Sequence, residues 1–163
     1  MKNIVFFLLL ISLNSFSQKN LNQLLKKYNT ESVPYISITE LQNENNVILL
    51  DAREPKEFEI SHLKNAICVG YDFFNLEKTL KKLPQNKNTK IVVYCSLGIR
   101  SEDIAEKLQK QGYTNIFNLY GGIFEWKNQN NTLVNKENKP TEKVHTFNKE
   151  WSKWLYKGEK IYE

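Results

Sequence analysis

Five short apolar runs alternate along the chain with polar or helical segments, and this alternation restricts the possible folds more than any other feature. The runs lie within residues 35–120 and read YISI, NVILLD, NAICVG, KIVVYC and YTNIFNLY. Each has the length and the β-branched or aromatic content of a strand. Strands that alternate with helices form a parallel sheet with helices on both faces. We therefore predict an α/β fold of three α/β/α layers around a five-stranded parallel sheet.

The N-terminus has the layout of a secretory signal peptide. Lys2 precedes an apolar run over residues 4–13, and small residues follow at Ser15 and Ser17. This pattern predicts a signal peptide over residues 1–17, with cleavage after Ser17 and an exported, periplasmic mature chain. An uncleaved membrane anchor is the alternative, although the run is about half of the roughly 20 residues that cross a bilayer.

Two extensions flank the predicted domain, which we place at residues 34–127. Apolar residues at helical spacing predict an N-terminal helical extension within 18–33. In the C-terminal extension, 128–163, apolar residues predict a helix that packs back on the domain, with a partner-binding surface as the alternative. The residues on its apolar side are Val144, Phe147, Trp151, Trp154 and Leu155.

The charge of the chain favours no nucleic-acid partner. Its 23 basic and 18 acidic residues give a formal net charge of +5. They are spread along the sequence without a run of five like charges, so we interpret the charge as a contribution to solubility and a mild attraction for anions.

Cys95 lies between a strand and a helix, where the carboxyl ends of parallel strands usually hold the ligand site. Gly98 permits a curled loop whose N–H groups turn inward, and the helix that Ser101 is predicted to cap points its free N–H groups at the same place. Such a setting lowers a cysteine pKa from about 8.5 to between about 3.5 and 7.5. The pattern favours a nucleophilic thiolate. A buried structural cysteine at a strand end is the alternative.

Cys68 is the other cysteine of the chain and lies between apolar residues. In an oxidising compartment it could pair with Cys95, either as a structural disulfide or for thiol redox chemistry. A disulfide requires Cα atoms less than about 7 Å apart, so the fold decides this alternative.

Three separated motifs resemble the rhodanese-like domain family: LLDAREPKEFEISHLKNAICV, IVVYCSLGIRS and GYTNIFNLYGGIFEW. They fall within residues 34–126, a little over half of the chain. Two positions depart from the pattern, because Ser61 and Asn65 stand where the family commonly has glycine. The predicted extensions lie outside the resemblance, which says nothing about them.

The resemblance implies a sulfurtransferase that needs no cofactor and no metal. The Cys95 thiolate attacks a donor such as thiosulfate, carries the sulfur as a persulfide, and yields it to cyanide, a small thiol or a protein thiol. The implied substrate-binding residues, which act mainly through backbone N–H groups or charge, are Ser96, Leu97, Gly98, Ile99, Arg100, Ser101 and Arg53. Arg100 is the expected charged contact to the donor, whereas Arg53 either lines the rim or is structural. The implied supporting residues are Asp51, Glu57 and His62.

Two other functions remain as alternatives. Related phosphatases have a loop one residue longer between cysteine and arginine, so the four residues 96–99 favour sulfur over a phosphate ester. A carrier or protein-binding module that delivers sulfur to a partner protein is also compatible with the sequence.

Overall fold

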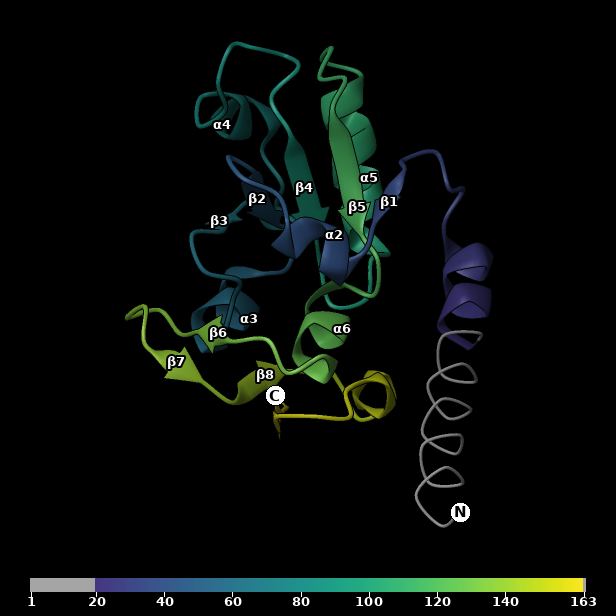
Figure 1. Ribbon diagram of the computed structural model, residues 1–163, viewed down its shortest axis with the longest axis vertical. Helices are drawn as coiled ribbons and strands as arrows, with labels where there is room; N and C mark the ends of the chain where they lie inside the picture. The colour runs from purple at the N-terminus through teal and green to yellow at the C-terminus, as the bar shows by residue number, and fades with distance from the viewer. Residues whose placement is uncertain (1–19, 163) are drawn as a thin grey trace. The chain divides into compact units, whose positions relative to one another are not determined.

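The computed structural model describes residues 20–162, and its centre is a five-stranded parallel sheet (Figure 1). The strand order is β1-β5-β4-β2-β3. The strands are β1 (Tyr35–Ile36), β2 (Ile48–Asp51), β3 (Ile67–Cys68), β4 (Ile91–Tyr94) and β5 (Ile116–Leu119). Each lies within one of the five predicted runs, and all the pairings are parallel. The predicted α/β sheet is confirmed.

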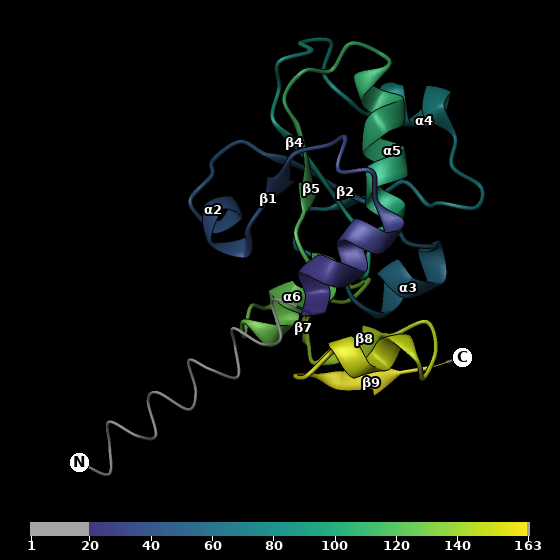
Figure 2. The same ribbon diagram turned by 90° about the vertical axis from the view of Figure 1, so that its right-hand side faces the viewer.

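Helices cover the two faces of this sheet. Figure 2 shows α2 on one side, and α4 and α5 on the other. The helices are α2 (Ile38–Gln42), α3 (Pro55–Ile60), α4 (Leu76–Leu80), α5 (Arg100–Gln109) and α6 (Gly122–Asn128). The core forms where Ile104, Ala105 and Leu108 of α5 meet fully buried residues of β2 and β4, and this packing fixes the start of α5 beside the end of β4.

Residues 20–28 form a helix that belongs to a unit separate from residues 32–163. This helix falls within the predicted N-terminal extension. The predicted signal peptide, 1–17, lies outside the described residues and remains a prediction. Among residues 20–162, no helix is both long and apolar enough to span a membrane.

The C-terminal extension differs from the predicted helix. It contains β6 (Leu133–Val134), β7 (Pro140–Thr141), β8 (Lys143–His145), the 3-10 helix η1 (Trp151–Trp154) and β9 (Glu159–Ile161). β6 pairs with β7, and β8 pairs with β9. Phe147 has φ 64°, which a continuous α-helix excludes. Val144 and Leu155 are buried as the apolar pattern predicts, but a strand and the end of a 3-10 turn supply them.

One departure from the family pattern has a backbone explanation. Asn65, which replaces a common glycine, adopts φ 65°. Asparagine tolerates this left-handed conformation better than most residues, so the turn before β3 is kept.

Candidate active site

Cys95 directly follows β4, and residues 96–99 form a tight loop that leads into α5. Gly98 has φ 105°, a conformation that a side chain would strain, so the loop depends on glycine here. The helix begins at Arg100 with Ile99 as its N-cap. The prediction that Ser101 caps this helix is therefore wrong. Ser101 lies in the first turn, where its hydroxyl reaches inward instead.

The Cys95 thiol is buried and surrounded by donors. The Gly98 N–H donates to Sγ at 3.2 Å, and the Ser101 hydroxyl does so at 3.6 Å. Burial alone would raise the pKa of Cys95, but the Arg100 charge, the Ser101 hydroxyl and the N–H groups of Ser101 and Gly98 outweigh it and hold the pKa below its ordinary value. These groups favour a thiolate at the end of β4.

The rate of Cys95 alkylation by iodoacetamide should rise with pH through a midpoint below about 8.5, the value of an ordinary thiol, because only the thiolate reacts. We expect Arg100→Gln to move this midpoint upward, since burial then acts with less opposition. Arg100→Lys keeps the charge and should shift the midpoint less. Mass spectrometry of the Cys95 peptide across pH measures each midpoint, and equal midpoints in all three proteins would contradict the role of Arg100.

The glycine pair of the third motif, Gly121 and Gly122, begins a helix that contacts the cysteine loop. The N–H groups of Ile123 and Phe124 donate to the carbonyls of Cys95 and Ser96 at 2.9 and 3.1 Å. A Cβ on Gly122 would lie 2.3 Å from the Cys95 carbonyl oxygen, so only glycine permits this approach. The first turn of α6 therefore fixes the position of the backbone at Cys95 and Ser96.

Asn118 of β5 is a positioning residue that the sequence analysis missed. Its side-chain amide donates to the Gly98 carbonyl at 2.8 Å, and its oxygen accepts from the Ser101 hydroxyl at 2.7 Å, so the one proton of this hydroxyl is shared between Asn118 and Sγ. Asn118 is fully buried. A polar residue in the middle of the apolar run YTNIFNLY was the available signal, because buried amides require partners.

Arg100 is held by Glu57 of α3. Its Nη1 and Nη2 donate to the two carboxylate oxygens at 2.8 and 2.9 Å, and Nη2 also donates to the Ser96 hydroxyl at 3.2 Å. Burial opposes ionisation of Glu57, but the bonds and charge of Arg100 hold the pKa of this carboxyl below its usual range. Arg100, the residue predicted to bind the sulfur donor, is thus already paired with a carboxylate. Glu57 therefore positions Arg100 in the site in addition to supporting its own loop.

Arg53 lies away from the Cys95 pocket. It is fully buried and bonds Asp51 through Nε and Nη2 at 3.0 and 2.6 Å, while Nη2 also donates to the Ser61 carbonyl. Arg53 is not among the residues that line the pocket. The geometry matches the structural alternative for Arg53 rather than the substrate-binding one.

His62 also supports the scaffold. Its ring stacks on Phe58, its Nδ1 lies 2.9 Å from the Phe58 carbonyl, and its backbone pairs with Val134 of β6. These contacts join the loop after α3 to the C-terminal extension.

Cys68 occupies a different strand and has a different chemistry. The register pairs Asp51 with both Cys68 and Tyr94, so Cys68 lies two strand spacings, about 10 Å, from the end of β4. This separation exceeds the reach of a disulfide. Burial raises the pKa of Cys68 to about 11, with Asp51 adding to the effect. Both cysteines are free thiols.

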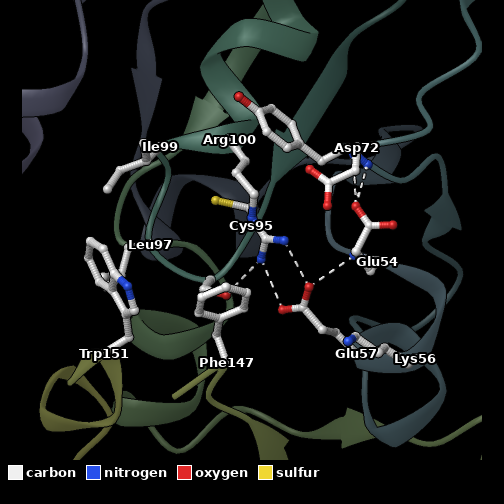
Figure 3. A pocket seen from close by; sticks show the side chains of 12 residues that line it. Glu54, Lys56, Glu57, Asp72, Cys95, Leu97, Ile99, Arg100, Phe147 and Trp151 are labelled. Carbon is white, nitrogen blue, oxygen red and sulfur yellow. Dashed lines mark hydrogen bonds and ion pairs between the residues drawn. The ribbon is translucent and has the colours of Figure 1, made fainter. Parts of the chain in front are cut away.

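A cavity of about 330 Å³ opens over Cys95 (Figure 3). Its lining residues are Glu54, Lys56, Glu57, Tyr71, Asp72, Cys95, Ser96, Leu97, Ile99, Arg100, Phe147 and Trp151. In the view of Figure 3, apolar side chains gather on the left of Cys95 and carboxylates on the right. Leu97 and Ile99 therefore contribute side chains to the pocket, besides the backbone role that the sequence predicted. Within residues 20–162, no cluster of three or more His, Cys, Asp or Glu residues could hold a metal ion.

Comparison with known families agrees with this geometry. Residues 37–129 match the Rhodanese-like domain family, and because the match covers more than half of the sequence, the chain belongs to that family. The resemblance of the three motifs to this family is therefore confirmed.

Relatives and solved structures define how far the similarity extends. A tRNA uridine(34) hydroxylase of Hamiltonella defensa is 34% identical over 91 residues, 55% of this chain and 26% of that protein. A probable adenylyltransferase/sulfurtransferase MoeZ of Mycobacterium tuberculosis is 33% identical over 55% of this chain and 22% of that protein. The chain thus spans about a quarter of these relatives. A rhodanese-related protein of Thermoplasma volcanium superimposes with a TM-score of 0.54 and 29% identity, covering 62% of this chain and 97% of that one.

Proposed function

We propose that the protein is a sulfurtransferase in which Cys95 carries sulfane sulfur as a persulfide. The observation that carries the proposal is a thiol with a lowered pKa at the base of a pocket, held by the Gly98 N–H and the Ser101 hydroxyl. Membership of the rhodanese-like family supports it, as does a relative whose name includes sulfurtransferase.

The reaction proceeds in two balanced steps. With thiosulfate as donor, the Cys95 thiolate attacks the outer sulfur, a new S–S bond forms, and the S–S bond of the donor breaks as sulfite leaves with the electron pair. The product is a Cys95 persulfide anion, whose negative charge lies on the outer sulfur in the pocket, while the donors to Sγ hold the inner sulfur in place. A thiolate or cyanide then attacks the outer sulfur of the persulfide and releases the Cys95 thiolate.

Peptide mapping by mass spectrometry tests the proposal directly. After incubation with excess thiosulfate or an organic thiosulfonate, the peptide that contains Cys95 should gain the mass of one sulfur atom, and cyanide should remove it. The peptide that contains Cys68 should gain none, because the raised pKa of Cys68 keeps it a thiol. Absence of added sulfur on Cys95 with every donor would refute the proposal.

We also propose that the chain is exported and that the mature protein begins at Gln18. The support is the signal-peptide pattern of Lys2 and the apolar run that follows. N-terminal sequencing of the protein from the envelope fraction checks this. A mature chain that still begins at Met1 would favour the anchor.

A further inference from the structure

Two aromatic side chains from the C-terminal extension line the Cys95 pocket. Phe147 and Trp151 lie beyond residues 37–129, the part of the chain that matches the family. Figure 1 shows the extension running past α6, whose first turn holds the cysteine loop. The pocket of this chain is thus built partly from residues that the family fold does not supply.

Phe147 and Trp151 together form what we call the aromatic side of the pocket. Hydrogen bonds fix the backbone that carries these two residues. The Phe147 N–H donates to Nδ1 of buried His145 at 3.1 Å, and the Thr146 N–H donates to the Ile161 carbonyl of β9 at 2.9 Å. The positive φ of Phe147 then turns its side chain out of the strand direction. The Asn148 side chain accepts the Trp151 N–H at 3.0 Å and so starts the 3-10 helix. Both rings are therefore presented by an ordered backbone.

The same segment is joined to the rest of the domain at two points. Asn128 of α6 donates to the Trp154 carbonyl at 2.9 Å and accepts the Tyr156 N–H at 2.7 Å. Lys127 of α6 forms an ion pair with Glu142 at 2.7 Å. The aromatic side is attached to the helix that also supports the cysteine loop.

The charges of the pocket disfavour a small dianion. Three carboxylates line it, from Glu54, Glu57 and Asp72, against the two cations Lys56 and Arg100. Arg100 and Glu57 neutralise each other through both terminal nitrogens of the guanidinium, which leaves the carboxylates of Glu54 and Asp72 against the single cation Lys56. A compact dianion such as thiosulfate would meet carboxylates on one side and apolar carbon on the other, so only the donors next to Sγ would replace part of its hydration.

The side of the pocket opposite the carboxylates is apolar, and it favours a sulfur donor that carries an apolar organic group. Phe147 lines the pocket and is 50% exposed, so this large apolar residue remains accessible to a ligand. Trp151, Leu97 and Ile99 continue this surface toward the cysteine. A cavity of about 330 Å³ lies at the lower end of the range for small-molecule sites.

We propose that the Cys95 pocket takes a small sulfane-sulfur compound with an apolar organic body, and that Phe147 and Trp151 select it. This inference rests on the proposed sulfur transfer at Cys95. An organic thiosulfonate, RSO₂S⁻, is the suitable probe. The Cys95 thiolate attacks its terminal sulfur, the S–S bond breaks, and the sulfinate RSO₂⁻ leaves with the electron pair. The group R stays against the aromatic side until the sulfinate departs.

The test compares two thiosulfonates that differ only in R, benzenethiosulfonate and methanethiosulfonate, with cyanide as acceptor. The measured quantity is the ratio of their kcat/KM values. We expect Phe147→Ala and Trp151→Ala each to lower this ratio at least about fivefold relative to the wild type, because the phenyl group loses its packing surface. Comparing the ratio between proteins cancels the different intrinsic reactivity of the two donors.

Two further variants serve as controls. Phe73→Ala removes a phenyl ring that is 92% exposed and outside the pocket, and should leave the ratio unchanged. Phe147→Tyr keeps an aromatic ring and should keep most of the ratio even if Phe147→Ala lowers stability. A ratio that is equal in the wild type, Phe147→Ala and Trp151→Ala would overturn the inference while leaving sulfur transfer intact. Loading of Cys95 by thiosulfate but by neither thiosulfonate would also overturn the inference, whereas failure of all three donors to load Cys95 would refute the proposed function.

Discussion

Cys95→Ser should abolish sulfur transfer, lowering the rate of thiocyanate formation by on the order of 10⁴-fold or more. Serine is close to cysteine in size and keeps the hydrogen bonds of the loop, so the fold should persist. Its hydroxyl does not ionise in this setting and cannot hold a persulfide. The assay is thiocyanate production from benzenethiosulfonate or thiosulfate with cyanide, together with the intact mass after donor treatment.

Cys68→Ser is the matched control for this substitution. It makes the same chemical change about 10 Å away, at a thiol whose pKa is raised to about 11. We expect activity within about twofold of the wild type, since surface or partly buried positions outside a site have small effects. Equal loss in both variants would show that the two cysteines act together and would revive the redox alternative.

The sheet was predictable because each strand has a recognisable pattern within its own few residues. Runs such as KIVVYC combine strand length with β-branched residues, and the helical segments between them force parallel connections. The cysteine loop was predictable for the same reason, because Cys95, Gly98 and Arg100 lie within six consecutive residues. Local sequence determines local geometry when all of its parts are adjacent along the chain.

The contacts that complete the site come from distant parts of the chain. Glu57 meets Arg100 across 43 residues, and Asn118 meets Gly98 across 20. No spacing rule connects such pairs, and only the sheet order brings them together. The motifs identified Arg100 and Glu57 separately, but the ion pair that commits Arg100 to a carboxylate required the fold.

The C-terminal extension shows how an apolar pattern can be assigned to the wrong element. Val144, Phe147, Trp151 and Leu155 have helical spacing, yet a strand, a turn and a 3-10 helix supply them. Periodicity shows which residues are apolar, whereas the pairing of β8 with β9 depends on residues 16 positions further along the chain. The same apolar residues are divided between the core and the pocket, a division that the sequence alone did not indicate.

Asp51 and Arg53 form a fully buried ion pair outside the Cys95 pocket, and we expect its loss to destabilise the fold as strongly as single substitutions commonly do. Arg53→Met leaves the Asp51 carboxylate without the two side-chain donors that compensate its burial, and the Ser61 carbonyl loses its partner as well. We expect the free energy of unfolding in urea to fall by about 3–5 kcal/mol, a large part of the 5–15 kcal/mol typical of a domain.

The double variant Asp51→Asn/Arg53→Met separates charge from packing. It leaves no buried charge at this position, so it should be more stable than Arg53→Met alone even though it carries an additional substitution. Lys90→Met is the surface control, because the Lys90–Glu44 pair is 25% and 33% exposed and should contribute at most about 1 kcal/mol. Comparable losses of stability in Lys90→Met and Arg53→Met would contradict the role of burial.

Sulfur loading of Cys95 tests whether Arg53 is structural. If it is, loading in Arg53→Met should be proportional to the fraction of folded protein. Loss of loading in fully folded protein would instead show that Arg53 binds the substrate.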